Sequence, residues 1–140
     1  MEADRNIADV LGTLKLFADL SRPQLEAAVH TLEEDWYSEG QRILRQGLTG
    51  SGFHIILEGE AAVKLSDRDV AKLGRGDFFG EISVLLGEPP TADVVALGPL
   101  RCVVLPGPLL QEFLETNPKV MFRMLQAEAG RLRNSLRWEA

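Results

Sequence analysis

"FGEISVLLGEPPTADVVA", residues 79–96, joins two apolar, strand-like runs through a glycine, a short apolar segment and two prolines. Gly80 follows the run "DFF" and allows the backbone to approach a ligand closely, since glycine has no Cβ atom. The next segment, "EISVLL", can form a short helical turn whose first N–H groups face outward and attract an anion. This stretch therefore predicts two strands connected by a small anion-binding turn.

Short β-type runs surround this stretch on both sides. They are separated by glycine-containing turns such as "GSG" and "GRGD". Because such short runs cannot each bury an apolar face alone, the pattern predicts a mainly β fold with flanking helices, a jelly roll or double-stranded β-helix of about eight strands. The expected strands lie within residues 42–46, 53–59, 61–65, 69–74, 77–79, 92–97 and 101–105.

Helical signals occur at both ends of the chain. Ser21 and Gln24 have the spacing of a capping box, so a helix should begin near Arg22. A long helix is expected near the end, with Asn117 as its N-cap and Pro118 in its first position. The expected parts of a single domain over residues 1–140 are a helical start (1–35), a β-roll (36–106) and C-terminal helices (107–140).

Composition excludes several classes of protein. The 140 residues are enough for one domain with a hydrophobic core, and 45% apolar against 26% charged residues is a globular balance. A net charge of −6 argues against a nucleic-acid binder, which needs a basic face. The single cysteine, Cys102, allows no intramolecular disulfide, and no apolar run approaches the ~20 residues of a membrane span. We expect a cytoplasmic protein without membrane or nucleic-acid partners.

An ordered set of segments carries a family resemblance: "LFADLS", "EGQRILRQG", "FHIILEGEAAV", "LGRGDFFGEISVLLGEP", "VLP" and "NPKVMFRMLQAEAGRLR". Over residues 16–133 the chain resembles a cyclic nucleotide-binding domain, the regulatory module of the catabolite activator protein, of cAMP-dependent kinase regulatory subunits and of gated channels. The resemblance implies that residues 79–92 form the phosphate-binding cassette, here called the cassette. It also implies cAMP or cGMP as ligand and no further cofactor.

The resemblance also implies a set of ligand-binding residues. Glu81 would accept a hydrogen bond from a sugar hydroxyl, Thr91 would touch the phosphate, and Arg131 and Ser135 would lie near the nucleotide. The alternatives are that Glu81 only complements a helix dipole and that Arg131 and Ser135 are ordinary surface or interface residues. The full expected set is Gly80, Glu81, Ile82, Ser83, Thr91, Ala92, Arg131 and Ser135.

The cassette departs from the family at one position. Aligned without gaps, Pro90 stands where the family has an arginine that pairs with the cyclic phosphate. Proline has neither a side-chain donor nor a backbone N–H. Loss of a buried charge partner costs ~3–5 kcal/mol, or ~10²- to 10³-fold in affinity or more. We therefore expect a degenerate cassette that binds cyclic nucleotide weakly.

The last helix carries a regular apolar seam. Its members are Phe122, Leu125, Ala129, Leu132 and Leu136, at alternating spacings of three and four residues. Such spacing is typical of helices that pair along one side. We expect a homodimer through this helix, and the alternative is that the seam packs only against its own barrel.

Three functions stay open at this point. The first is a regulatory domain that senses a cyclic nucleotide or a related anion through its last helix. The second is a degenerate domain that serves as a dimerisation or protein-interaction module without nucleotide. Catalysis is the third and is not expected, because Ser83 has no His–Asp pair to activate it and two histidines are too few for the usual metal centre of a jelly roll.

Overall fold

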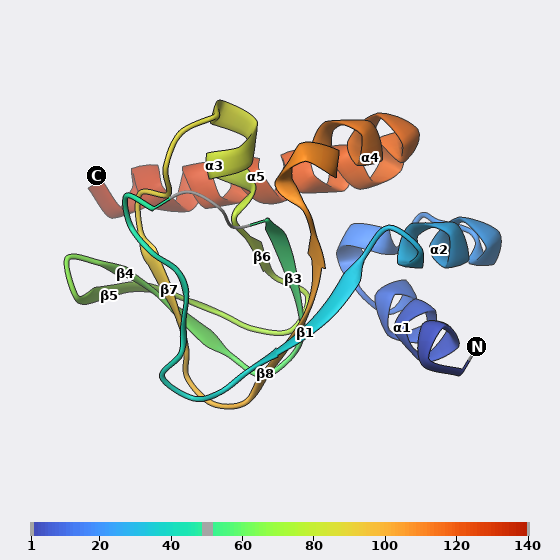
Figure 1. Ribbon diagram of the computed structural model, residues 1–140. Helices are drawn as coiled ribbons and strands as arrows, with labels where there is room; N and C mark the ends of the chain where they lie inside the picture. The colour runs from blue at the N-terminus through green and yellow to red at the C-terminus, as the bar shows by residue number, and fades with distance from the viewer. Residues whose placement is uncertain (1, 49–51, 140) are drawn as a thin grey trace.

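The structure is a computed structural model that describes residues 2–48 and 52–139. Helices at both ends of the chain flank a β-roll (Figure 1). The helical elements are α1 (Glu2–Gly12), η1 (Lys15–Phe17), α2 (Arg22–Val29), α3 (Glu81–Leu86), η2 (Gly107–Leu109), α4 (Leu110–Thr116) and α5 (Pro118–Glu139). The strands are β1 (Glu33–Tyr37), β2 (Arg42–Leu44), β3 (Phe53–Glu58), β4 (Ala61–Leu65), β5 (Arg68–Leu73), β6 (Phe78–Phe79), β7 (Asp93–Ala96) and β8 (Leu100–Leu105).

The eight strands described form two antiparallel four-stranded sheets, in the orders β1-β8-β3-β6 and β2-β7-β4-β5. This arrangement confirms the predicted mainly β roll with flanking helices. The first strand, β1, was not among the expected strands, and it begins at Glu33, before the expected start of the roll at residue 36. Its sequence, "EEDWY", is exposed at four of its five positions, so it lacks the apolar alternation by which strands are recognised.

Two cores lie on opposite faces of the β3–β8 pair, because successive side chains of a strand point to opposite faces. Ile55 and Val103 pack against the flanking helices. Ile56 and Cys102 point the other way, into the interior of the roll against the second sheet. This double burial explains why "FHIIL" and "CVVL" read as continuous apolar runs.

The helix α2 begins as the sequence predicts. Ser21 accepts a hydrogen bond from the N–H of Gln24, and the Gln24 side chain accepts one from the N–H of Ser21. The start of α5 is also confirmed at Pro118, but Asn117 acts differently from the prediction. Its Nδ2 donates to the carbonyl of Phe113 at 2.9 Å and so closes the end of α4 instead of capping α5 through its side chain. One asparagine thereby joins the two helices.

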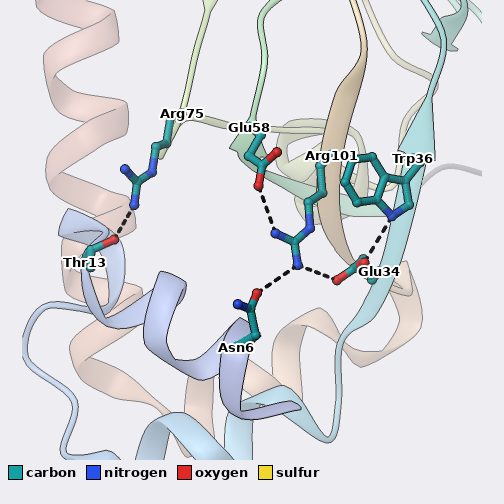
Figure 2. Close-up of polar contacts among 7 residues, drawn as sticks. All are labelled: Asn6, Thr13, Glu34, Trp36, Glu58, Arg75 and Arg101. Atoms are coloured by element: carbon teal, nitrogen blue, oxygen red, sulfur yellow. Dashed lines mark hydrogen bonds and ion pairs between the residues drawn. The ribbon is translucent and has the colours of Figure 1, made fainter. Parts of the chain in front are cut away.

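The helix α1 was not predicted as a separate element, although Ile7, Ala8, Leu11 and Leu14 have helical spacing and are buried. Two polar contacts fasten it to the roll (Figure 2). Arg101 of β8 donates to Asn6 at 3.3 Å and pairs with Glu34 and Glu58. At the other end of α1, Arg75 donates to the hydroxyl of Thr13 at 2.6 Å.

Among the described helices, none is long and apolar enough to cross a membrane.

Candidate functional site

The cassette begins with a backbone conformation that only glycine adopts easily. Gly80 has φ 90° and ends β6, and α3 begins at the next residue. The carbonyl of Gly52 lies so close that a Cβ atom on Gly80 would overlap it. Gly80 therefore allows two backbone segments to meet at the start of the cassette.

A buried histidine contacts the residues on both sides of this junction. His54 is 4% exposed, stacks on Phe79 with ring centroids 4.7 Å apart, and places Nδ1 3.0 Å from the carbonyl oxygen of Gly52. Because a carbonyl can only accept, Nδ1 carries the proton and Nε2 accepts the hydroxyl of Tyr37 at 3.1 Å. Burial lowers the pKa of His54 and keeps the ring neutral. The sequence did not indicate this role, since His54 stands alone in an apolar strand.

Glu81, the first residue of α3, is the most deeply buried acidic side chain described, at 1% exposure. Its Oε1 accepts a hydrogen bond from Arg131 at 3.1 Å. Within the described chain, its Oε2 has no hydrogen-bond partner. Burial, and then repulsion from Glu128, raises the pKa of Glu81 to about 8, although Arg131 acts in the opposite direction. The site thus holds a buried carboxyl group with one oxygen that lacks a hydrogen-bond partner in the described chain.

Arg131 of α5 makes the contact between the last helix and the cassette (Figure 1 shows α3 beside α5). Besides Glu81, its guanidinium bonds the carbonyl of Phe78 at 2.7 Å and Glu128 at 2.9 Å. It also lies over the Phe78 ring, 4.3 Å from the centroid. Ser135, four residues further on, is exposed and is not brought into this cluster. Of the two α5 residues expected near the nucleotide, the structure therefore places Arg131 beside the cassette and leaves Ser135 apart.

The remainder of α3 is mostly solvent-facing. Ile82 is 49% exposed. Ser83 is used in closing the turn: its hydroxyl donates to the carbonyl of Glu88, and its carbonyl accepts the N–H groups of Gly87 and Glu88. The Ser83 hydroxyl is therefore already engaged within the cassette.

The end of the cassette is joined to the segment after β2. Pro90 is buried, and its carbonyl accepts the N–H of Gly47 at 2.9 Å. Thr91 is exposed and Ala92 is half-buried, so this end has one hydroxyl free to meet a ligand. No lysine or arginine occurs in residues 79–92. Any cation that faces a phosphate here must come from outside the cassette.

The apolar seam of α5 does not pack against the barrel. Phe122, Leu125, Leu132 and Leu136 are 58–64% exposed, and Ala129 is exposed as well. We call these five residues the exposed stripe. Val120 and Met124 of α5 are buried in the core that the flanking helices share with one face of β3 and β8, and Ala127 packs against the same core. The alternative that the seam packs only within the domain is thus wrong.

Comparisons with known proteins agree with this architecture. The sequence profile of the "cyclic nucleotide-binding domain" family matches residues 34–117. A cGMP-dependent protein kinase of Eimeria tenella is 32% identical over 91% of this chain, which spans only 13% of the kinase. A cyclic nucleotide-binding domain from Methylobacillus flagellatus has a TM-score of 0.80 at 28% identity and covers 96% of this chain and 80% of its own. The Thermus thermophilus catabolite activator protein has a TM-score of 0.76 at 25% identity, covering 86% of this chain and 59% of its own.

Proposed function

Because this chain belongs to the cyclic nucleotide-binding domain family, we propose that it is a regulatory domain whose cassette binds a cyclic nucleotide weakly and whose last helix transmits the response. The single observation that carries this proposal is the contact of Glu81 with Arg131, which links the cassette to α5. A sensor needs an element whose position a ligand can bias, and in the described structure Arg131 forms an ion pair between α5 and the cassette. The domain itself would act by binding rather than by catalysis, in the cytoplasm.

The ligand would engage the carboxyl of Glu81 first. Its buried Oε2 has no partner in the described chain, and a sugar hydroxyl could supply one. A buried polar atom without a partner costs about 1–3 kcal/mol, so satisfying it favours binding. Thr91, exposed at the far end of the cassette, would offer its hydroxyl to the phosphate. We propose cAMP or cGMP as the ligand because both combine these two groups.

Pro90 sets the strength of this interaction. The position expected to hold an arginine is instead buried proline, whose carbonyl is engaged by Gly47. Without the ion pair, affinity should fall by ~10²- to 10³-fold or more. Calorimetric titration of the chain with cAMP and with cGMP tests the proposal, and the expected dissociation constants are millimolar. Micromolar or tighter binding would show that Pro90 does not weaken the site. Absence of any binding to both ligands, before and after Pro90→Arg, would refute a nucleotide site.

A second function is supported by the exposed stripe of α5. Four large apolar side chains at 58–64% exposure on one helix are a feature of interaction surfaces. We propose that two copies pair through this helix, parallel across a two-fold axis, because a two-fold interface lets one self-complementary face cover itself. If the cassette binds no nucleotide, dimerisation through α5 would be the function that the domain retains.

A further inference from the structure

A concave surface lies between the N-terminal elements and α5, and Ala129 is the one member of the exposed stripe that also lines it. It is a groove of about 890 Å³, lined by residues 13–16, 75–78, 123, 126, 127, 129–131, 133 and 134. Three separate parts of the chain build it: the segment after α1, the turn before β6, and the middle of α5. Figure 2 shows one edge, where Arg75 reaches Thr13. The volume is in the ~300–1,000 Å³ range of small-molecule sites.

The groove is positively charged in a chain whose net charge is −6. Its cationic lining residues are Lys15, Arg75, Arg123, Arg131 and Arg133, and its acidic lining residue is Asp77. Clefts lined by one sign of charge concentrate the electric field and attract ions of the opposite sign. The groove is therefore suited to an anion.

Part of this charge is not neutralised by the protein. Arg123 is paired with Asp19 at 2.8 Å, and Arg131 with Glu81 and Glu128. By contrast, Arg75 bonds only the neutral hydroxyl of Thr13. Within the described chain, Lys15 and Arg133 have no ion pair either. Three cations thus face the groove without an acidic partner, while Asp77 is held by the N–H of Gly74 at 2.8 Å.

We propose that this groove binds a small molecule with two or more phosphate groups. Guanidinium groups match phosphate oxygens in pairs, and an ammonium supplies a further point charge, so two arginines and a lysine suit a polyphosphate. The amides of Gln126 and Asn134 also line the groove and can bond neutral hydroxyls of the same molecule. The proposal does not require that the cassette bind nucleotide.

Occupancy of the groove would be sensed by the cassette through Arg131. Arg131 lines the groove, and its guanidinium donates to Oε1 of Glu81 at 3.1 Å. A phosphate in the groove competes with Glu81 for the same donors. Binding should therefore loosen the contact between α5 and α3 and shift the amide signals of Gly80 and Ile82.

Calorimetry with inorganic pyrophosphate at physiological salt tests the site. The double variant Lys15→Gln/Arg133→Gln should lose about tenfold or more in affinity, because each charge-assisted hydrogen bond accounts for roughly that factor. Neither side chain makes an ion pair in the described structure, so both variants should fold. The matched control is Arg68→Gln/Lys119→Gln, which removes the same charge from exposed positions outside the groove and should stay within about twofold of the parent.

Several outcomes would overturn the proposal. Equal losses in the two double variants would mean general electrostatic attraction rather than a site. No binding of pyrophosphate or tripolyphosphate by the parent would refute it outright. Tighter binding of an oligoglutamate peptide than of tripolyphosphate would assign the groove to an acidic protein segment instead. We expect a loss of affinity in Lys15→Gln/Arg133→Gln but not in the control variant. We also expect amide shifts at Gly76 and Gly130 that extend to Gly80.

Discussion

Gly80 meets the carbonyl oxygen of Gly52 at a distance that leaves no space for a Cβ atom, and it does so with φ 90°. Two backbone segments twenty-eight residues apart in the chain therefore form one junction at the start of the cassette. The junction depends on the absence of a side chain at Gly80. The loss of stability caused by adding a side chain there can therefore be measured.

Gly80→Ala should be more destabilising than Gly87→Ala. Both glycines have positive φ, and this conformation alone costs alanine about 1–2 kcal/mol. Only at Gly80 would the new methyl group also overlap backbone, which adds roughly 1–3 kcal/mol. Urea unfolding of the two variants measures the difference. Equal losses of stability in the two variants would mean that the backbones at Gly80 and Gly52 move apart at no cost.

Glu81→Gln should flatten the dependence of stability on pH. Burial raises the pKa of Glu81 from its ordinary 4.5 to about 8, so the folded chain binds more protons than the unfolded chain between these values. The free energy of unfolding of the parent must then fall as pH rises through this interval. We expect the parent to lose on the order of 1–3 kcal/mol more than the variant between pH 5 and pH 8.

Urea denaturation at these two pH values measures that loss. Glu88→Gln, at an exposed glutamate of the same cassette, is the control for removal of one carboxylate. Parallel pH profiles of the parent and Glu81→Gln would contradict a buried, largely protonated Glu81.

Pro90→Arg should improve binding of cAMP without improving binding of adenosine. Because residues 79–92 contain no cation, the phosphate of cAMP gains little from the cassette, and the parent should bind the two ligands with similar affinity. A new charge-assisted hydrogen bond should strengthen cAMP binding by ~10- to 100-fold. Calorimetry measures both ligands, with Pro89→Arg as the control for an arginine one position away. Equal gains for cAMP and adenosine would refute a phosphate contact at position 90.

Leu132→Glu should prevent self-association. Leu132 is 62% exposed near the middle of the exposed stripe, and a charge there would have to be buried between two copies. Sedimentation at tens of micromolar should show a dimeric parent and a monomeric variant. Gln126→Glu adds the same charge elsewhere on α5 and should remain dimeric. A monomeric parent would exclude the dimer.

Ligand binding should alter amide exchange across residues 126–139. A nucleotide that bonds Glu81 changes the partner of Arg131, and so changes how firmly the second half of α5 is held. We expect greater protection of this segment with saturating cAMP, while the buried strand β8 (Leu100–Leu105) stays unchanged. Unchanged exchange in α5 at proven occupancy would refute the switch, whatever the affinity.

Local signals in the sequence were sufficient for most of the fold. The capping box of Ser21 and Gln24, and Pro118 at the start of α5, are short-range patterns, and both are confirmed. Strand β1 was not among the expected strands, because its charged sequence lacks the alternation of apolar and polar residues. Asn117 does stand directly before α5 as predicted, but its side chain bonds the end of α4, since an asparagine side chain can serve either of two adjoining helices.

The candidate site required information that no local pattern contains. Glu81 and Gly80 could be selected from the cassette itself, but the contact of Glu81 with Arg131 spans fifty residues and depends on how α5 crosses the roll. The stacking of His54 on Phe79 and its hydrogen bond with Tyr37 are likewise tertiary contacts. Burial of the Glu81 carboxyl, which raises its pKa, also follows from packing and not from sequence spacing.

Asn117 fixes the start of α5 and is the pivot about which the helix can rotate. Its side chain holds the end of α4, and its carbonyl accepts the N–H groups of Val120 and Met121 at the start of α5. At 1.5 Å per residue, Arg131 lies ~20 Å from this pivot and the last described residue ~30 Å from it. A rotation of ~10° at the asparagine would move Arg131 by ~3 Å, enough to part it from Glu81, and would swing the tip of the helix by ~5 Å. A torsional adjustment at one residue can thus be amplified into a displacement the size of a helical turn.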